Sequence, residues 1–280
     1  MADKSVENPQ VARPYAEVIG DPIAHSKSPL IHGFWLDRLG MEADYRGIHV
    51  TPEGLAEYIA SRREDPLWRG CNVTIPHKLS VMEHVADPGD VRGSIGAMNT
   101  IARDETGALF GTNTDAGGFY APLGHSDFTG ADVAVIGAGG AARAVLFALA
   151  RMGVGTVTIH ARNAMKAMGL LASFGLKGHV RGMEDPLGDV GLLVNTSPLG
   201  MKGFDPLVVD LSPLPEGALV YDIVYAPLET ELLKQARARG LDTVDGLEML
   251  IGQAALAFEI FFGTAPPRNR DDELRALLTA

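Results

Sequence analysis

The sequence predicts a protein of the α/β class, made of two domains in which strands alternate with helices. Short apolar strands and amphipathic helices follow one another along the chain, and this alternation begins a second time near residue 132. A glycine-rich turn joins the first strand and the first helix of that second series. The length of 280 residues, with 46% hydrophobic and 21% charged residues, suits one large or two ordinary globular domains.

The first series predicts an N-terminal α/β domain with a mostly parallel sheet. Ser28 and Pro29 are typical of a helix start, with Ser28 as the N-cap, and Gly40 is typical of the helix end. Thr51 opens a second helix, and Pro76 ends a strand before a further helical pattern. The expected strands are 15–20, 45–50 and 70–74, followed by a hairpin of 99–103 and 108–112.

The second series predicts another largely parallel sheet. Its expected strands are 132–137, 156–161, 192–196, 219–224 and a short one near Thr243. The expected helices are 141–152, 164–174, 230–239, 247–262 and 271–278. We place the first domain at 14–115, completed by the C-terminal helices within 250–280, and the second domain at 116–249.

The turn after the first strand of the second series has the Gly-x-Gly-x-x-Ala form of a dinucleotide fingerprint. Gly137 permits a tight turn, Gly139 lets the backbone approach a pyrophosphate, and Ala142 lets the helix pack closely on the strand. The helix start then faces the phosphates. The flanking strand and helix supply the required context, so a Rossmann-like domain is favoured over an ordinary tight turn. The expected cofactor-binding residues here are Gly137, Ala138, Gly139, Gly140, Ala141 and Ala142.

The residues after the second strand of this domain favour NADP. An NAD site usually has a carboxylate there for the ribose 2′-hydroxyl. This chain has His160-Ala161-Arg162-Asn163 instead, with Lys166 one turn further on. The planar guanidinium of Arg162 would match a 2′-phosphate, and Lys166 adds a second cation. Two solvated surface cations are the alternative interpretation.

Composition excludes several other classes of function. The net charge of −11 repels nucleic-acid phosphates. No apolar run approaches the length of a membrane span, and the polar start, Met1 to Arg13, lacks the apolar core of a signal peptide. Cys71 is the only cysteine, so no intramolecular disulfide can form, which fits a cytoplasmic location. The eight histidines form no recognisable ligand spacing, and we expect no metal site.

Segments spread over nearly the whole chain resemble the shikimate dehydrogenase family. The first is Asn72-Val73-Thr74-Ile75-Pro76-His77-Lys78, similar to the family signature Asn-Val-Thr-x-Pro-x-Lys. The others are Ile23-Ala24-His25-Ser26-Lys27-Ser28-Pro29, Gly96 to Thr100, Gly111 to Asp115, Asn195 to Met201, Tyr221 to Pro227 and Asp245 to Gln253. One segment departs from the family, which often has Asn-Arg-Thr where this chain has Ala161-Arg162-Asn163.

The resemblance implies the reduction of 3-dehydroshikimate to shikimate with NADPH, and the reverse reaction. Hydride delivery to a ketone leaves an alkoxide, which needs a proton donor. By resemblance Lys78 and Asp115 are the catalytic pair, with the Lys78 ammonium held by the Asp115 carboxylate. A structural salt bridge at the domain junction is the alternative. His77 is a competing acid–base candidate, although the family pattern leaves its position open.

The resemblance also assigns the ligand-binding side chains. Ser26 and Ser28, helped by Tyr225, would bind the carboxylate of shikimate beside a helix start. The residues implied to bind the ring hydroxyls are Asn72, Thr74, Asn99, Asp115 and Gln253. Those implied to contact the nicotinamide and its ribose are Thr196, Pro198, Ile223, Gly246 and Met249.

Two other functions stay open at this point. One is the related oxidation of quinate with NAD, which Ser26, Ser28 and the missing acid near His160 disfavour. The other is a catalytically silent protein that senses shikimate or NADP, which an intact Lys78 and Asp115 disfavour. The small-molecule substrate would bind in a cleft between the domains of a monomer or homodimer.

Overall fold

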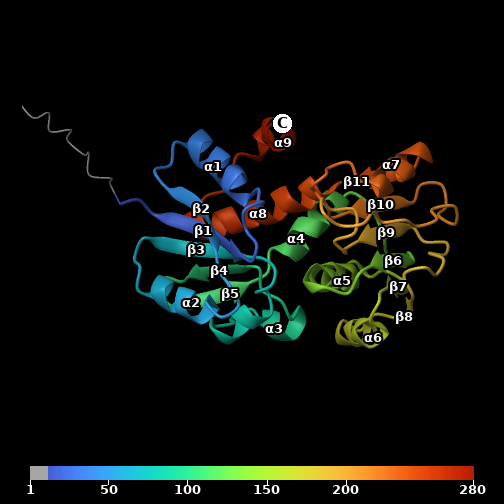
Figure 1. The fold of residues 1–280 in the computed structure, drawn as a ribbon, viewed down its shortest axis with the longest axis horizontal. Coiled ribbons are helices and arrows are strands. Elements are labelled where there is room, and N and C mark those ends of the chain that lie inside the picture. Colours follow the sequence, from blue (N-terminus) through green and yellow to red (C-terminus); the bar gives the residue numbers. More distant parts are fainter. Residues whose placement is uncertain (1–11) are drawn as a thin grey trace, which may run out of the picture.

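The structure is a computed structural model that describes residues 12–280. The first eleven residues, and with them most of the polar start noted above, lie outside the described part. Two sheets form separate lobes, which Figure 1 shows side by side, with the N-terminal strands in one lobe and β6 to β11 in the other. This arrangement confirms the α/β class with an N-terminal, mostly parallel sheet and a Rossmann-like second sheet.

The first sheet has the strand order β2-β1-β3-β4-β5. Pairing is parallel among β1, β2 and β3, whereas β4 and β5 form the expected antiparallel hairpin at one edge. The observed bounds are β1 Tyr15–Gly20, β2 Asp44–His49, β3 Trp68–Val73, β4 Thr100–Arg103 and β5 Leu109–Thr112.

Helices cover both faces of the first sheet. On one face α1 and the C-terminal helices bury an aromatic cluster that includes Trp35, Tyr45, Phe258 and Phe261. On the other face α2 and the following segments pack on Ile19, and Cys71 is fully buried there, as expected for a small core residue. The observed bounds are α1 Ser28–Leu39, α2 Leu55–Arg63, η1 Ser80–Glu83 and α3 Val91–Ser94.

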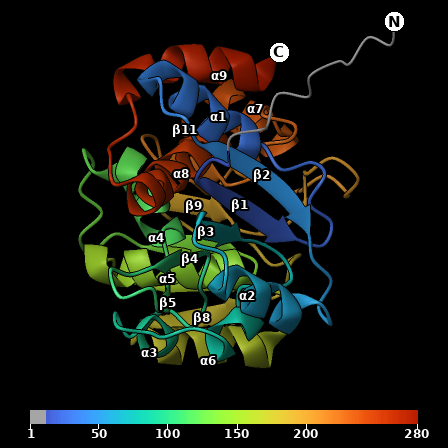
Figure 2. The same cartoon turned by 90° about the vertical axis from the view of Figure 1, so that its left-hand side faces the viewer.

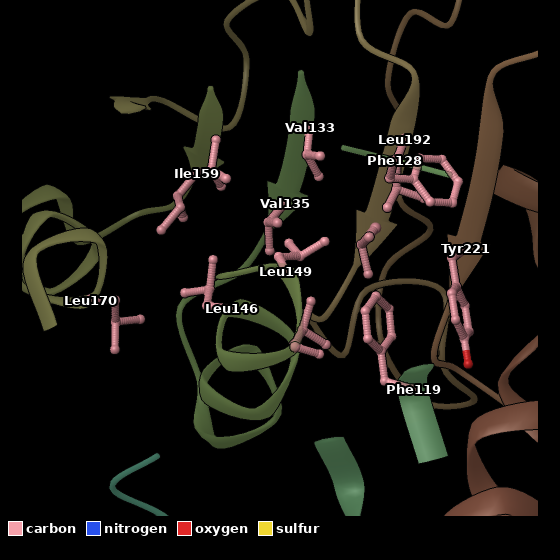
Figure 3. Packing of buried hydrophobic residues seen from close by; sticks show 14 of the residues in the cluster. Phe119, Phe128, Val133, Val135, Leu146, Leu149, Ile159, Leu170, Leu192 and Tyr221 are labelled. Atoms are coloured by element: carbon pink, nitrogen blue, oxygen red, sulfur yellow. The ribbon is translucent and has the colours of Figure 1, made fainter. Parts of the chain in front are cut away.

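The second sheet is parallel throughout, in the order β11-β10-β9-β6-β7-β8. Figure 3 shows Leu146 and Leu149 of the first helix packed under Val135 of the central strand. The strands are β6 Val133–Ile136, β7 Val157–His160, β8 Gly178–Arg181, β9 Leu192–Asn195, β10 Leu219–Asp222 and β11 Asp242–Val244. The helices are α5 Gly140–Met152, α6 Ala164–Ser173 and α7 Glu231–Ala238.

Two helices join the lobes. α4 (Asp115–Tyr120) and α8 (Gly246–Phe262) lie side by side between the sheets in Figures 1 and 2. A Cβ built on Gly118 would lie 2.6 Å from the backbone N of Gln253, so only glycine lets the two helices come this close. The remaining segments are η2 Ala121–Leu123, η3 Arg268–Arg270 and α9 Asp271–Thr279, which packs on α1.

Local expectations were wrong at several places. The second helix begins at Leu55 with Gly54 as its N-cap, and not at Thr51. Lys27, not Ser28, is the N-cap of α1, and Ser28 is its first helical residue. The segment after Pro76 forms turns and a short 3-10 helix, because the chain folds back to put His77 into the core. β8 was not expected, since three of its four residues are exposed and show no apolar pattern. In residues 12–280, no helix is long and apolar enough to cross a membrane.

Candidate active site

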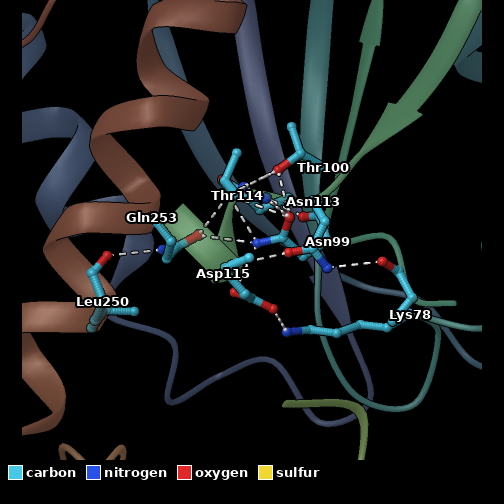
Figure 4. A network of polar contacts seen from close by, with 11 residues as sticks. Lys78, Asn99, Thr100, Asn113, Thr114, Asp115, Leu250 and Gln253 are labelled. Carbon is cyan, nitrogen blue, oxygen red and sulfur yellow. Dashed lines mark hydrogen bonds and ion pairs between the residues drawn. The ribbon is translucent and has the colours of Figure 1, made fainter. Parts of the chain in front are cut away.

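The Lys78 ammonium and the Asp115 carboxylate meet between the lobes. Lys78 lies in the loop after β3, and Asp115 is the first residue of α4. The distance from Lys78 Nζ to Asp115 Oδ2 is 2.5 Å, and the two side chains are 16% and 8% exposed. Figure 4 shows the pair at one edge of a polar network. Because the Lys78 ammonium keeps a small solvent contact, it can also contact a bound ligand. The ammonium of a fully enclosed salt bridge could not.

The loop that carries Lys78 is anchored on both sides of it. The Lys78 carbonyl oxygen accepts a hydrogen bond from the Met98 backbone N at 2.8 Å. The His77 ring is fully buried, and its Nε2 lies 2.7 Å from the Val50 carbonyl oxygen. A carbonyl oxygen only accepts, so Nε2 carries a proton in this bond. His77 is therefore a structural anchor of the loop, and its burial removes the case for it as the acid–base group.

The other carboxylate oxygen of Asp115 is held by an amide. Asn99 Nδ2 donates to Asp115 Oδ1 at 2.8 Å and to Thr114 Oγ1 at 2.9 Å. The same nitrogen, Asn99 Nδ2, also lies 3.4 Å from Oε1 of Gln253 on α8. Figure 4 shows these side chains converging from three segments of the chain. The arrangement fixes the orientation of the carboxylate that faces Lys78.

Asn72, at the end of β3, belongs to the same buried region. Its Oδ1 accepts from the Tyr45 hydroxyl at 2.6 Å, and its Nδ2 donates to Thr100 Oγ1 at 3.1 Å. Thr74 follows two residues later and is partly exposed. The expected hydroxyl-binding residues Asn72, Asn99, Asp115 and Gln253 thus lie in one network, whereas the Thr74 side chain makes no hydrogen bond to it within the described residues.

The two serines lie at the start of α1. Ser26 Oγ accepts a hydrogen bond from the Ser28 backbone N at 3.3 Å, and Ser28 is buried. Tyr225, in the loop after β10, packs against the cluster that α1 and α8 form, and burial raises the pKa of its phenol. A neutral phenol and two hydroxyls can donate hydrogen bonds to a carboxylate.

The fingerprint turn has the geometry that a pyrophosphate needs. Gly137 has a φ of 105°, which side chains rarely adopt, and a Cβ there would lie 2.9 Å from Thr196 Oγ1. Gly139 is the N-cap of α5, and a Cβ on it would meet no atom within 4 Å. No side chain caps α5, so its first backbone N–H groups can face an anion. Ala142 is fully buried against the strand.

The cations expected at the adenosine end lie where α6 begins. Arg162 and Lys166 are both exposed, and neither forms an ion pair within residues 12–280. Asn163, where the family often has a hydroxyl residue, caps α6 by accepting from the Lys166 backbone N at 2.9 Å. The departure from the family pattern therefore keeps a helix cap and leaves both cations free for a phosphate.

The residues expected near the nicotinamide follow the ends of β9 and β10. Thr196 is buried and donates to the Ile136 carbonyl oxygen at 2.8 Å. Gly246 allows a close approach, because a Cβ there would lie 2.4 Å from the Ile223 carbonyl oxygen. Met249 is buried in the core of the second lobe, and Pro198 is exposed. The Thr196, Gly246 and Met249 positions thus have a packing reason as well as the expected cofactor role.

The fingerprint turn and the Lys78–Asp115 pair adjoin each other. A Cβ built on Gly140, the first residue of α5, would lie 3.9 Å from Lys78 Cδ. Hydride transfer needs the substrate carbon in contact with the nicotinamide, so a catalytic group of the first lobe must reach the cofactor side of the second. Lys78 of the first lobe lies beside the first turn of α5, as such a reaction would require.

Sequence reasoning missed several buried side chains that support the site. They include Tyr45, Thr114 and Asp222. The Asp222 carboxyl accepts hydrogen bonds from Asn195 Nδ2 at 2.9 Å and from Thr230 Oγ1 at 2.7 Å, and burial raises its pKa. Asp222 and Asn195 lie in quoted family segments, so those motifs were the available signal. Tyr45 stands in an ordinary strand pattern, and nothing local marks it. Among the described residues, no group of three or more potential ligands could hold a metal ion.

Comparison with known families gives two domain matches. Residues 18–101 match the model of the shikimate dehydrogenase substrate binding domain. Residues 246–270 match the model of the shikimate 5′-dehydrogenase C-terminal domain.

Full-length relatives agree with these matches. The shikimate dehydrogenase (NADP(+)) of Sphingopyxis alaskensis is 70% identical over 96% of this chain and 98% of its own length. The shikimate 5-dehydrogenase of Thermus thermophilus, solved with NADP(H) and shikimate, is 35% identical with a TM-score of 0.84, covering 95% of this chain and 99% of that one. The quinate dehydrogenase of Corynebacterium glutamicum, solved with NAD, is 30% identical with a TM-score of 0.84, covering 95% and 99%.

Proposed function

The chain belongs to the shikimate dehydrogenase family, and from that premise we propose that Lys78 and Asp115 are the catalytic pair of an NADP-dependent enzyme that interconverts 3-dehydroshikimate and shikimate. The observation that carries the assignment of the pair is the 2.5 Å contact between Lys78 Nζ and Asp115 Oδ2, beside the fingerprint helix. Bound NADPH supplies the hydride that reduces the ketone carbon. The chain's own residues manage the proton and the orientation of the substrate.

The Lys78 ammonium donates a proton to the ketone oxygen as that oxygen gains negative charge. Asp115 holds the ammonium, and Asn99 holds Asp115 through the 2.8 Å bond to Oδ1. In the reverse direction the Lys78 amine takes the proton of the shikimate hydroxyl. Asn72, Asn99, Asp115 and Gln253 are all buried, so the network behind Lys78 is enclosed and fixes the carboxylate that holds the ammonium.

The substrate is oriented by its two ends. Ser26, Ser28 and Tyr225 bind the carboxylate, and Asn72, Thr74, Asn99, Asp115 and Gln253 bind the ring hydroxyls. The turn from Gly137 to Ala142 would hold the pyrophosphate of the cofactor, and Arg162 and Lys166 would hold its 2′-phosphate. The residues that would contact its nicotinamide and ribose are Thr196, Pro198, Ile223, Gly246 and Met249. The exposed cations and the open space at Gly139 support this placement.

Two further assignments complete the proposal. The domains are 14–115 with 250–280, and 116–249; the second division falls inside α8, which continues unbroken from one lobe to the other. The enzyme works in the cytoplasm, and the buried, unpaired Cys71 fits a reducing compartment.

A spectrophotometric assay with shikimate and quinate, each with NADP and NAD, tests the substrate and cofactor. We expect the highest kcat/KM for shikimate with NADP. A preference for quinate with NAD, as in the Corynebacterium relative, would move the activity to that sister reaction.

Lys78→Met tests the catalytic pair. We expect kcat to fall about 100-fold or more, the usual scale for a lost acid–base group, while the Kd for NADP changes little. Lys234→Met, which removes an exposed lysine of α7, is the control and should keep the wild-type rate. A folded Lys78→Met enzyme that turns over near the wild-type rate would remove Lys78 from the reaction.

A further inference from the structure

A line of hydrogen bonds runs through the buried base of the candidate substrate site, and it includes two side chains that the site assignment does not use. Tyr45 lies on β2 and is 9% exposed, and Thr100 lies on β4 and is fully buried. The Tyr45 hydroxyl donates to Asn72 Oδ1 at 2.6 Å, and Asn72 Nδ2 donates to Thr100 Oγ1 at 3.1 Å. Thr100 Oγ1 donates in turn to Asn99 Oδ1, also at 3.1 Å.

One end of this line reaches the proposed catalytic pair. There Asn99 Nδ2 donates to Asp115 Oδ1, and Asp115 Oδ2 accepts from Lys78. At the other end lies the Tyr45 hydroxyl, and burial raises the pKa of this phenol well above its ordinary value. Tyr45 therefore stays protonated and can act as the donor that starts the line.

Two backbone groups fix the direction of the line. The Asn99 carbonyl oxygen can only accept, and it faces Asn72 Nδ2 at 3.5 Å. The Thr114 backbone N–H can only donate, and it lies 2.7 Å from Asn99 Oδ1. Each amide thus has one orientation. Asn72 is left with its Oδ1 as the group that can accept from a substrate hydroxyl, and Asn99 keeps its Nδ2 toward Asp115.

We propose that Tyr45 and Thr100 are positioning residues, which hold the amides of Asn72 and Asn99 in the orientations that substrate binding and the Lys78–Asp115 pair require. The inference rests on the proposed function of the site. Tyr45 is itself well placed for this role, because its ring stacks on the His32 ring at a centroid distance of 3.9 Å and 4° between planes. Hydroxyl groups held in a buried network restrict amide rotation more than solvent would.

Tyr45→Phe removes the hydroxyl and keeps the stacked ring. We expect KM for shikimate to rise about 3- to 10-fold, the scale of one neutral hydrogen bond, with the Kd for NADP unchanged. Thr100→Val should raise KM by a similar factor, and Thr100→Ser should restore the wild-type value. Tyr15→Phe is the matched control, because it removes a 2.5 Å hydroxyl bond to Asp65 at the opposite end of the sheet. Its KM should stay unchanged.

Asn72→Ala decides whether Tyr45 acts through Asn72. If it does, adding Tyr45→Phe to Asn72→Ala leaves KM at the value of the single variant. A further rise in KM in the double variant, or an equal rise in Tyr15→Phe, would overturn the inference. A wild-type enzyme without shikimate turnover would refute the proposed function as well, whereas turnover with unaltered KM in Tyr45→Phe and Thr100→Val would refute the positioning role alone.

Discussion

His32 is a single residue that should make the stability of the first lobe depend on pH. Its ring is fully buried, and both ring nitrogens lack a hydrogen-bond partner in the part of the chain that the structure describes. Burial lowers its pKa from 6.5 to about 3. The unfolded chain therefore binds a proton below pH 6.5 that the folded chain excludes until about pH 3.

His32→Phe should remove this dependence. In the wild type we expect the free energy of unfolding to be highest above pH 6.5 and to fall, as the pH drops toward 3, by about 1.4 kcal/mol per pH unit from this residue. The phenylalanine variant should show a flatter profile over the same range, since its ring fills the site without titrating. Urea unfolding at several pH values measures the difference, and His179→Phe, at an exposed position of β8, is the control. Parallel profiles for wild type and His32→Phe would contradict the effect.

Arg162 should decide the preference between the two cofactors. Only NADP carries the 2′-phosphate that a guanidinium can bind through charge-assisted hydrogen bonds, worth about 1.5–3 kcal/mol. Arg162→Ala is expected to weaken NADP about 10- to 100-fold and NAD little. Fluorescence titrations with both cofactors measure this, with Arg69→Ala, an exposed cation of β3, as the control. Equal losses for NADP and NAD would mean that Arg162 does not lie at the 2′ position.

Among the elements, the crossing of α4 and α8 controls the geometry of the site. α4 begins with Asp115 and α8 carries Gln253, and the two helices touch through Gly118 and Gly252. A Cβ on Gly118 would lie 2.7 Å from the Met249 carbonyl oxygen, and backbone atoms cannot rotate away as a side chain could. The spacing of these helices therefore sets the distance between the Asp115 carboxylate and the Gln253 amide.

Gly118→Ala should push the helices apart. We expect a loss of about 1–3 kcal/mol in the free energy of unfolding, as for other overpacked cores, and a higher KM for shikimate. Gly169→Ala is the matched control, because Gly169 lies inside α6 with no atom near its missing Cβ. The free energy of unfolding of Gly169→Ala should equal that of the wild type or exceed it by up to about 1 kcal/mol. Denaturant unfolding and steady-state kinetics of both variants check the contrast, and a Gly118→Ala enzyme as stable and active as Gly169→Ala would contradict the argument.

At the scale of the whole molecule, α8 should make the two lobes unfold together. Met249 belongs to the core of the second lobe, whereas Phe258 and Phe261 belong to the core of the first. Unfolding either lobe would expose part of the same helix. Both tryptophans, Trp35 and Trp68, are buried in the first lobe, so their fluorescence follows that lobe alone.

Thermal unfolding can test this coupling with two probes. We expect tryptophan fluorescence and far-ultraviolet circular dichroism to give the same Tm. Saturating NADP, which we propose to bind the second lobe, should raise the Tm seen by the tryptophans as much as that seen by circular dichroism. Separate transitions, or a cofactor effect on circular dichroism alone, would show that the lobes unfold independently.

Local pattern in the sequence determined the class of fold and most of its elements. β1, the hairpin of β4 and β5, and the turn from Gly137 to Ala142 follow from apolar periodicity and glycine placement, which act over a few neighbouring residues. The family segments pointed to Lys78 and Asp115 for the same reason, because each motif is contiguous. β8 was not predicted, because an exposed edge strand has no buried face that would require alternating apolar residues.

Tertiary structure alone decided which of those local pieces meet. Lys78 and Asp115 are 37 positions apart, and their contact depends on the loop anchored by His77 and on the crossing at Gly118. The position of Tyr45 in the site also depends on tertiary structure. Its hydroxyl on β2 reaches Asn72 on β3 only because β1 pairs with β2 on one side and with β3 on the other. Short-range propensities carry no information on strand order or helix spacing. Those follow from how the buried surfaces of distant segments fit, and the polar network of the site depends on that fit.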